Sequence, residues 1–339
     1  AFANGATPLG NVKVKHDHWL PSFNLKLDPT DNFVIRYAWS TAISRPDMGN
    51  LRNYVSVSND TPDSSNPDDS LWVKDANGNI TGATIYYSGK AHNPYLKPIE
   101  AKQHDLSFEY YWSAVGSASV AFFRKDFDNY IQSGTYNRTF VNNGVTRTAE
   151  ITGPVNGDGA SLQGFEVAFQ TFFDFLPSPW DGLGIQANYT YIDNKGITNT
   201  NLNNNQPGGG DSIDAQAPDS IKVEALEGLS KDSFKVIGMY EKDKLALRLA
   251  YSWRSEYLVT ARDCCVVYPV WSEDQGHLDA SIRYNLTDNI EISLQGSNLL
   301  NTETKLKQQV TDTDKGGLLL PNAWFQNDRR FTLGVRFQY

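Results

Sequence analysis

Apolar and polar residues alternate with a period of two in about eleven segments of this chain, and the clearest of them lies at the carboxyl end. There, polar or small residues alternate with five apolar ones, Phe331, Leu333, Val335, Phe337 and Tyr339. Successive side chains of a β-strand point to opposite faces, so this spacing places the five apolar groups on one face. The segment is as long as the roughly 9–11 residues that a tilted strand needs to cross a bilayer. It therefore predicts a strand with one face toward hydrocarbon.

Ten further segments alternate in the same way, at 21–27, 33–40, 106–112, 117–131, 165–170, 185–191, 234–240, 245–253, 278–284 and 290–295. Within 117–131 the phase changes near Phe122 and Phe123, which predicts a bulge. Short turns are expected at 28–32, 113–116, 177–182, 241–243 and 286–288. Long connections alternate with them at 45–98, 132–160, 193–232, 254–275 and 299–328. Tight turns at one end and long loops at the other are typical of an antiparallel transmembrane β-barrel with extracellular loops.

The odd number of strands has its own consequence. In an antiparallel series of eleven, the first and last strands run in the same direction and cannot pair antiparallel to close a barrel. Open edges in lipid would leave backbone amides without partners, at a cost of several kcal/mol each. We therefore expect that this chain is the carboxyl-terminal part of a larger barrel, unless the count misses a strand.

Composition narrows the function classes. Phe, Tyr and Trp make up 12% of the chain, which suits a barrel with two aromatic girdles. A formal net charge of −9 argues against nucleic-acid binding. No apolar run approaches the roughly 18 residues of a transmembrane helix. No Walker loop, His-Glu-x-x-His or Gly-x-Ser-x-Gly motif occurs, so we expect neither an enzyme nor a cofactor.

Several short motifs resemble TonB-dependent outer-membrane transporters. They are Leu20–Leu25, Thr30–Asn32, Ile43–Pro46, Tyr284–Asn289 and Gly296–Asn301, in the order that the family shows, followed by a last strand with an aromatic end. The resemblance implies about the last 11 strands of a 22-stranded barrel in the Gram-negative outer membrane. Residues 1–339 would then form one part of the barrel domain, with the plug domain, the TonB box and the amino-terminal strands outside this chain. The long 45–98 connection looks most like Caulobacter- and Xanthomonas-type receptors, many of which import carbohydrates.

What the resemblance implies about function is active transport. A nutrient would bind among the loops and the plug, and TonB with its inner-membrane energising complex would drive uptake. An oligosaccharide is the first expected ligand, and a ferric siderophore is the alternative. A passive outer-membrane channel and a soluble β-sandwich lectin are the rival classes. Outer-membrane lipid and lipopolysaccharide would surround the barrel.

Charged residues at alternate strand positions are predicted to face a wet interior, because lipid does not tolerate them. In TonB-dependent transporters, which this chain resembles, the charged inner wall of the barrel contacts the plug. In a passive channel the same wall would line open water. The candidates are Arg36, Glu109, Glu166, Arg248, Asp279, Arg283, Glu291 and Arg336.

Aromatic and polar residues of the long connections are the candidates for ligand binding. Aromatic faces stack on the C–H faces of sugars, and amide, carboxylate and guanidinium groups bond to hydroxyls; a siderophore receptor would use similar residues. The alternative is that they pack the loops or belong to the outer girdle. The candidates are Trp72, Tyr86, Tyr87, Asn93, Tyr95, Arg254, Arg262, Asp263, Trp271 and Trp324.

The two cysteines, Cys264 and Cys265, are adjacent in one of these connections. They are expected to form a disulfide with each other, although a bridge to another molecule stays open. His16 and His18 share a strand face, but no third ligand accompanies them, so no metal site is expected.

Overall fold

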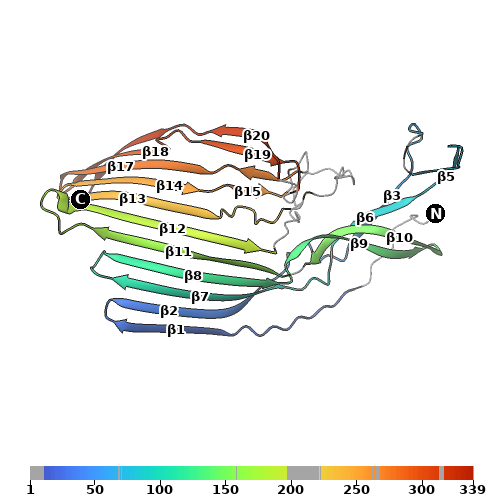
Figure 1. Ribbon diagram of the computed structural model, residues 1–339, viewed down its shortest axis with the longest axis horizontal. Helices are drawn as coiled ribbons and strands as arrows, with labels where there is room; N and C mark the ends of the chain where they lie inside the picture. Colours follow the sequence, from blue (N-terminus) through green and yellow to red (C-terminus); the bar gives the residue numbers. More distant parts are fainter. Residues whose placement is uncertain are drawn as a thin grey trace.

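The computed structural model describes residues 11–67, 69, 71–157, 159–196, 221, 223–261, 263, 268–312 and 317–338. Its largest unit is an antiparallel sheet of eleven strands (Figure 1). In their order of pairing, the strands are β1 (Ser22–Thr30), β2 (Phe33–Ser44), β7 (Ile99–Tyr111), β8 (Ser117–Asp128), β11 (Ala160–Phe172), β12 (Leu183–Lys195), β13 (Asp232–Lys242), β14 (Leu245–Arg254), β17 (Gln275–Thr287), β18 (Ile290–Ser297) and β21 (Arg330–Phe337). Each overlaps one predicted segment, which confirms the predicted all-β class.

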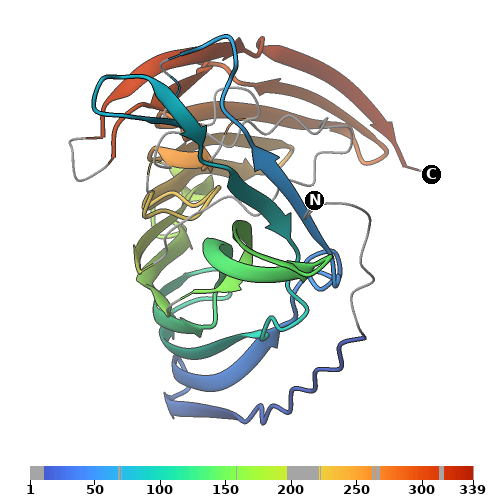
Figure 2. The ribbon, with the colours of Figure 1, turned by 90° about the vertical axis from the view of Figure 1, so that its right-hand side faces the viewer.

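The main sheet is open, with β1 and β21 as its two edges. Seen from the side of the long connections, its strands lie along an arc from β1 to β21 (Figure 2). This arrangement is consistent with part of a barrel. Among the described residues, no helix is long and apolar enough to span a membrane.

Five short turns gather at one end of the strands and the long connections at the other (Figure 1). This is the alternation that the sequence predicts. The predicted bulge near Phe122 is wrong, because β8 pairs in continuous register with both β7 and β11 from Ser117 onward. Strand β8 also ends at Asp128 and does not continue to residue 131. The next residue, Asn129, has φ +59°, a left-handed conformation that breaks the strand.

One face of the main sheet is apolar and uncovered. The pairs Leu294–Leu333 and Ile282–Leu294 join apolar side chains into a row across β17, β18 and β21. Leu333 is 72% exposed and Phe331 is 65% exposed. A soluble sandwich would bury this face against a second sheet, so the exposure contradicts the lectin alternative. We call it the apolar face, and the opposite one the polar face.

Aromatic side chains form two groups on the apolar face. Toward the long connections, ring contacts join Phe122, Phe165, Tyr189 and Tyr191 on β8, β11 and β12, and a second set joins Phe234, Tyr251 and Trp253 on β13 and β14. Toward the short turns, Trp112 contacts Tyr110 and Phe169, and Phe33 stacks on Phe108. The two groups lie where barrels carry their interfacial girdles.

The long connections contain ten strands that the alternation did not predict. One sheet joins β3 (Val55–Asp60), β6 (Tyr86–Ala91), β10 (Val145–Asn156) and β9 (Ile131–Asn142) in that order. A second joins β15 (Tyr257–Thr260), β16 (Val270–Ser272), β19 (Glu303–Gln309) and β20 (Leu319–Gln326). A hairpin of β4 (Trp72–Lys74) and β5 (Ile80–Ala83) stands apart (Figure 1). Most of the buried apolar residues, such as Ile151 and Leu258, belong to these connections.

Candidate functional site

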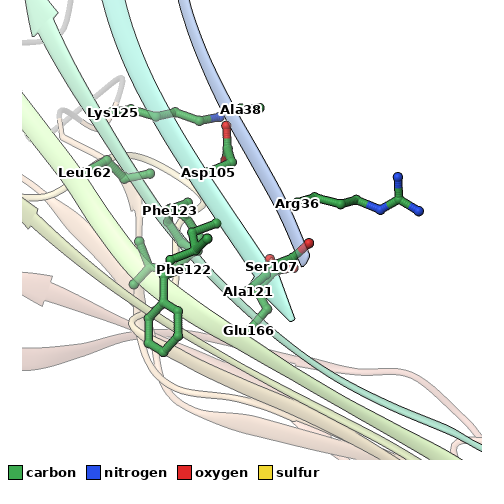
Figure 3. A pocket seen from close by; sticks show the side chains of 12 residues that line it. Arg36, Ala38, Asp105, Ser107, Ala121, Phe122, Phe123, Lys125, Leu162 and Glu166 are labelled. Carbon is green, nitrogen blue, oxygen red and sulfur yellow. The ribbon is translucent and has the colours of Figure 1, made fainter. Parts of the chain in front are cut away.

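A hollow of about 490 Å³ opens on the polar face between β2 and β12 (Figure 3). We call it the inner hollow. Both charge signs and apolar groups line it together. The side chains on the polar face that reach it are Arg36, Ala38, Asp105, Ser107, Ala121, Phe123, Lys125, Leu162, Glu166 and Ile192. The mixture suits contact with another polypeptide or with a ligand that carries polar and apolar parts.

Strand register brings these residues together. Arg36 pairs with Ser107, and Ala121 with Glu166, in one row across four strands. In the next row Phe123 lies between Asp105 and Gly164. A Cβ at Gly164 would come within 2.0 Å of the Tyr191 carbonyl oxygen and 2.7 Å of the Phe123 ring, so the glycine permits the close approach of both. The sequence analysis missed Phe123 and Lys125 because it placed a phase change there; strict alternation from Ala121 would have found both.

The charges of the inner hollow differ in their partners. Arg36 Nε donates to Glu109 Oε1 at 3.0 Å, and Glu109 also accepts from the hydroxyls of Ser107 and Tyr111. In the described part of the chain, the side chains of Lys125 and Glu166 take part in neither an ion pair nor a hydrogen bond. These two side chains can therefore bind an incoming group without first breaking an existing bond.

All eight charged candidates occupy positions on the polar face. Besides the Arg36–Glu109 pair, Arg248 contacts Glu241 at 3.0 Å, and Asp279 accepts from the Asn298 main chain at 2.9 Å. The others, Glu166, Arg283, Glu291 and Arg336, occupy positions of the same phase on β11, β17, β18 and β21.

The described ligand-binding candidates are scattered, and the structure does not bring them into one site: Tyr86 and Tyr87 lie on β6, Trp271 on β16, Trp324 on β20, Trp72 on the β4–β5 hairpin, Arg254 at the end of β14, and Asn93, Tyr95 and Asp263 between strands. Several of them hold loops together. Tyr87 packs on the buried cluster around Ile151, and Asn93 Nδ2 donates to the Pro154 carbonyl at 3.1 Å. In the second sheet, Trp271 Nε1 donates to Gln309 Oε1 at 2.8 Å.

Arg254 and Trp72 likewise serve the fold. The Arg254 guanidinium lies 3.7 Å from the centroid of the Tyr257 ring and donates to the Gly228 carbonyl. Trp72 Nε1 donates to the Asn66 carbonyl at 3.1 Å. The Asp263 amide donates to the Tyr268 carbonyl. Arg262, Cys264 and Cys265 lie outside the described residues.

Three aromatic candidates present open surface. Tyr95 is 65% exposed, Trp324 is 62% exposed, and Tyr86 is exposed to a smaller extent. Their exposed surface is what a ligand could stack on. Among the described residues, no three His, Cys, Asp or Glu side chains cluster as metal ligands would.

The chain belongs to the family described as TonB dependent receptor-like, beta-barrel, whose model matches residues 2–299. Members of this family are receptors of the outer membrane that transport their ligands. A search of curated proteins gives no match. The family assignment thus rests on the sequence model and agrees with the open antiparallel sheet.

Solved structures share this fold. The ferric enterobactin receptor PfeA from Pseudomonas aeruginosa, as a mutant with enterobactin bound, is 18% identical with a TM-score of 0.58, covering 94% of this chain and 40% of its own. The siderophore receptor PirA from Acinetobacter baumannii is 16% identical with a TM-score of 0.54, covering 95% and 41%. FpvAI, in a complex with pyocin S2, is 14% identical with a TM-score of 0.52, covering 95% and 34%. The chain thus spans between about a third and two fifths of the length of these structures.

Proposed function

We propose that this protein takes part in the TonB-dependent uptake of a nutrient across the Gram-negative outer membrane. The observation that carries the proposal is the division of one eleven-stranded sheet into an exposed apolar face and a charged face with a hollow. The first face suits outer-membrane lipid and lipopolysaccharide, and the second suits an enclosed interior. Membership of the receptor family supports the same function.

On this proposal, residues 1–339 are the carboxyl-terminal part of a barrel whose plug lies outside this chain. Charges of both signs on the polar face, including the unpaired Lys125 and Glu166, would contact the plug. TonB would act on the plug with energy from the inner membrane, and no covalent chemistry would occur in the barrel. A passive channel more often carries one dominant sign of charge along its wall, so the mixed charges favour the receptor.

The first proposed ligand is an oligosaccharide. Its support is the exposed rings of Tyr86 on β6, Trp324 on β20 and Tyr95 in the turn after β6, which offer flat faces for stacking. A ferric siderophore is the alternative, and its support is that the solved structures include receptors named for ferric enterobactin and siderophores. The long 45–98 connection is the reason for placing the carbohydrate-importing branch first.

Uptake and binding measurements test the proposal. Cells that produce the receptor should accumulate a labelled ligand only when TonB is functional, and purified receptor should bind that ligand directly. A panel of oligosaccharides and ferric siderophores decides between the two ligand classes. Tyr95→Ala and Trp324→Ala should weaken binding by about tenfold if each ring stacks on the ligand. Val141→Ala, an exposed apolar position of the same loop region, is the matched control.

The outcomes separate the classes. Uptake that continues without TonB, together with large open-state conductance in planar bilayers, would favour the passive channel. Binding of ferric siderophores but of no oligosaccharide would favour the alternative ligand.

A further inference from the structure

The turn between β11 and β12, residues 173–182, differs from the other short turns. The other four span two to five residues, whereas this one contains ten and includes the 3-10 helix η1 (Trp180–Gly182). Phe175 is 78% exposed and Trp180 is 58% exposed. Two large aromatic side chains in water at one turn are costly, because removing an aromatic ring from water is favourable. The exposure therefore points to a surface that covers these rings.

Hydrogen bonds and an ion pair fix the shape of this turn. The Leu176 amide donates to the Phe173 carbonyl at 3.0 Å, and the Trp180 amide donates to the Pro177 carbonyl at 2.9 Å. Lys242 Nζ on β13 contacts Asp181 Oδ1 at 2.5 Å and donates to Ser178 Oγ at 2.8 Å. These bonds therefore fix the backbone that carries the exposed rings of Phe175 and Trp180.

Strand register shows on which side of the sheet the turn lies. Lys242 pairs with Leu245, and two residues earlier Tyr240 pairs with Leu247, so Lys242 projects from the apolar face. Because its ammonium group holds Ser178 and Asp181, the turn is drawn toward that face. The Phe173 amide also donates to the Leu183 carbonyl and continues the ladder, which keeps Phe173 in phase with Phe169.

The turn continues the group of aromatic residues that lies toward the short turns on the apolar face. Phe173 meets Phe175 edge to face, with ring centroids 6.0 Å apart. Next to them on the apolar face, Trp112 contacts Phe169 at 5.6 Å, and its Nε1 donates to Thr171 Oγ1 at 3.3 Å. Aromatic side chains of one phase therefore follow each other from the end of β7 through β11 to the turn.

We propose that the 173–182 turn is an interfacial anchor, whose Phe175 and Trp180 side chains insert among phospholipid headgroups of the inner leaflet. The proposal rests on the membrane location in the proposed function. Tryptophan and phenylalanine suit this position because their rings are apolar while the headgroup layer satisfies the indole N–H. The Lys242–Asp181 pair reduces the cost of placing two charges near the acyl chains. A periplasmic protein is the other surface that could cover the rings.

Fluorescence quenching tests the anchor in the receptor extracted from the outer membrane and reconstituted into phosphatidylcholine vesicles. The Trp180 signal is the difference between wild type and Trp180→Phe. Bromine atoms on the acyl chains near the headgroup should quench it about twofold more than bromine atoms near the chain ends. Leu333→Trp, in the middle of β21 on the apolar face, should show the opposite preference.

The reference position makes the outcomes separable. Quenching at residue 333 without quenching of Trp180 would overturn the anchor and leave the membrane location in place. Absence of quenching at both positions would overturn both proposals. Lys242→Gln should reduce the headgroup preference of Trp180 by about twofold, because the turn is released. An unchanged preference would contradict the role of Lys242 in holding the turn toward the apolar face. A heat-modifiable band on gels shows that each variant folds.

Discussion

Asn156 binds both polar groups of the Lys97 main chain. Its Oδ1 accepts from the Lys97 amide at 2.9 Å, and its Nδ2 donates to the Lys97 carbonyl at 3.0 Å. The two residues belong to different connections, 45–98 and 129–159. Above them, β6 and β10 pair in parallel from Ser88–Glu150 to Lys90–Thr152. Two loops that are separate in sequence therefore form one unit, which we call the loop unit. It lies on the concave side of the arc in Figure 2.

Asn156→Ala should weaken the contact between the two loops of this unit at Lys97. The substitution leaves both Lys97 groups without a side-chain partner, at about 1–3 kcal/mol. Hydrogen exchange of the β6 and β10 amides should accelerate by about tenfold or more, whereas the amides of β11 and β12 should not change. Asn137→Ala, at an exposed position of the β9–β10 hairpin, is the control. Equal protection in both variants would show that Asn156 does not hold the loops together.

Gly153→Ala should disturb the same unit by a different route. A Cβ at this position would lie 2.2 Å from the Ala91 carbonyl oxygen, and a backbone atom can give way only if the strand moves. We expect about 1–3 kcal/mol of local destabilisation from this overlap. Gly238→Ala on β13 meets no atom within 4 Å and serves as the control. Limited proteolysis within 86–98 should distinguish the variants, and equal resistance would contradict the close approach.

The eleven barrel strands could be predicted from the sequence because each has lipid on one side and polar surroundings on the other. That contrast imposes a period of two, as in Phe331, Leu333 and Val335. The ten loop strands escaped prediction because their cores are formed between loops. Ile151 is buried through pairing of β10 with β6, about sixty residues earlier in the chain, and no local pattern reveals such a partner.

The candidate site was predicted only in part. Charges on the polar face follow from alternation, so Arg36 and Glu166 were identified. Phe123 was missed because an aromatic residue next to Phe122 was interpreted as a phase change, whereas one ring faces lipid and the other the inner hollow. Among the loop aromatics, composition could not separate Trp271, which is bonded to Gln309, from Trp324, which is exposed. That distinction depends on loop packing.

Charge substitutions on the two faces of β21 should have opposite effects. Leu333→Arg places a guanidinium on the apolar face and should cost about 2–4 kcal/mol in a bilayer. Thr332→Arg places the same group on the polar face, where its paired neighbour is Gln295, and should be tolerated. The fraction of heat-modifiable, folded receptor in vesicles measures the difference. Equal folding of the two variants would contradict the assignment of the faces.

Acid should loosen the loop unit through His92. Burial, and secondly the positive charge of Arg52, lower the pKa of His92 below its ordinary value of 6.5. The ring of Tyr54 lies 5.7 Å from that of His92, and the His92 amide donates to the Tyr54 carbonyl. The folded loop thus holds His92 neutral, and opening of the loop allows it to take up a proton.

The sign of the pH dependence follows from that difference in proton binding. The stability that His92 contributes is fully present above pH 6.5 and is lost as the pH falls through the lowered pKa of the folded state. Hydrogen exchange of β3 and β6 should therefore be faster at about pH 5.5 than at about pH 7.5, after correction for intrinsic exchange rates. His92→Gln should reduce this acid sensitivity, whereas His16→Gln, outside the loop unit, should retain it. Acid sensitivity that persists unchanged in His92→Gln would assign the effect to another group.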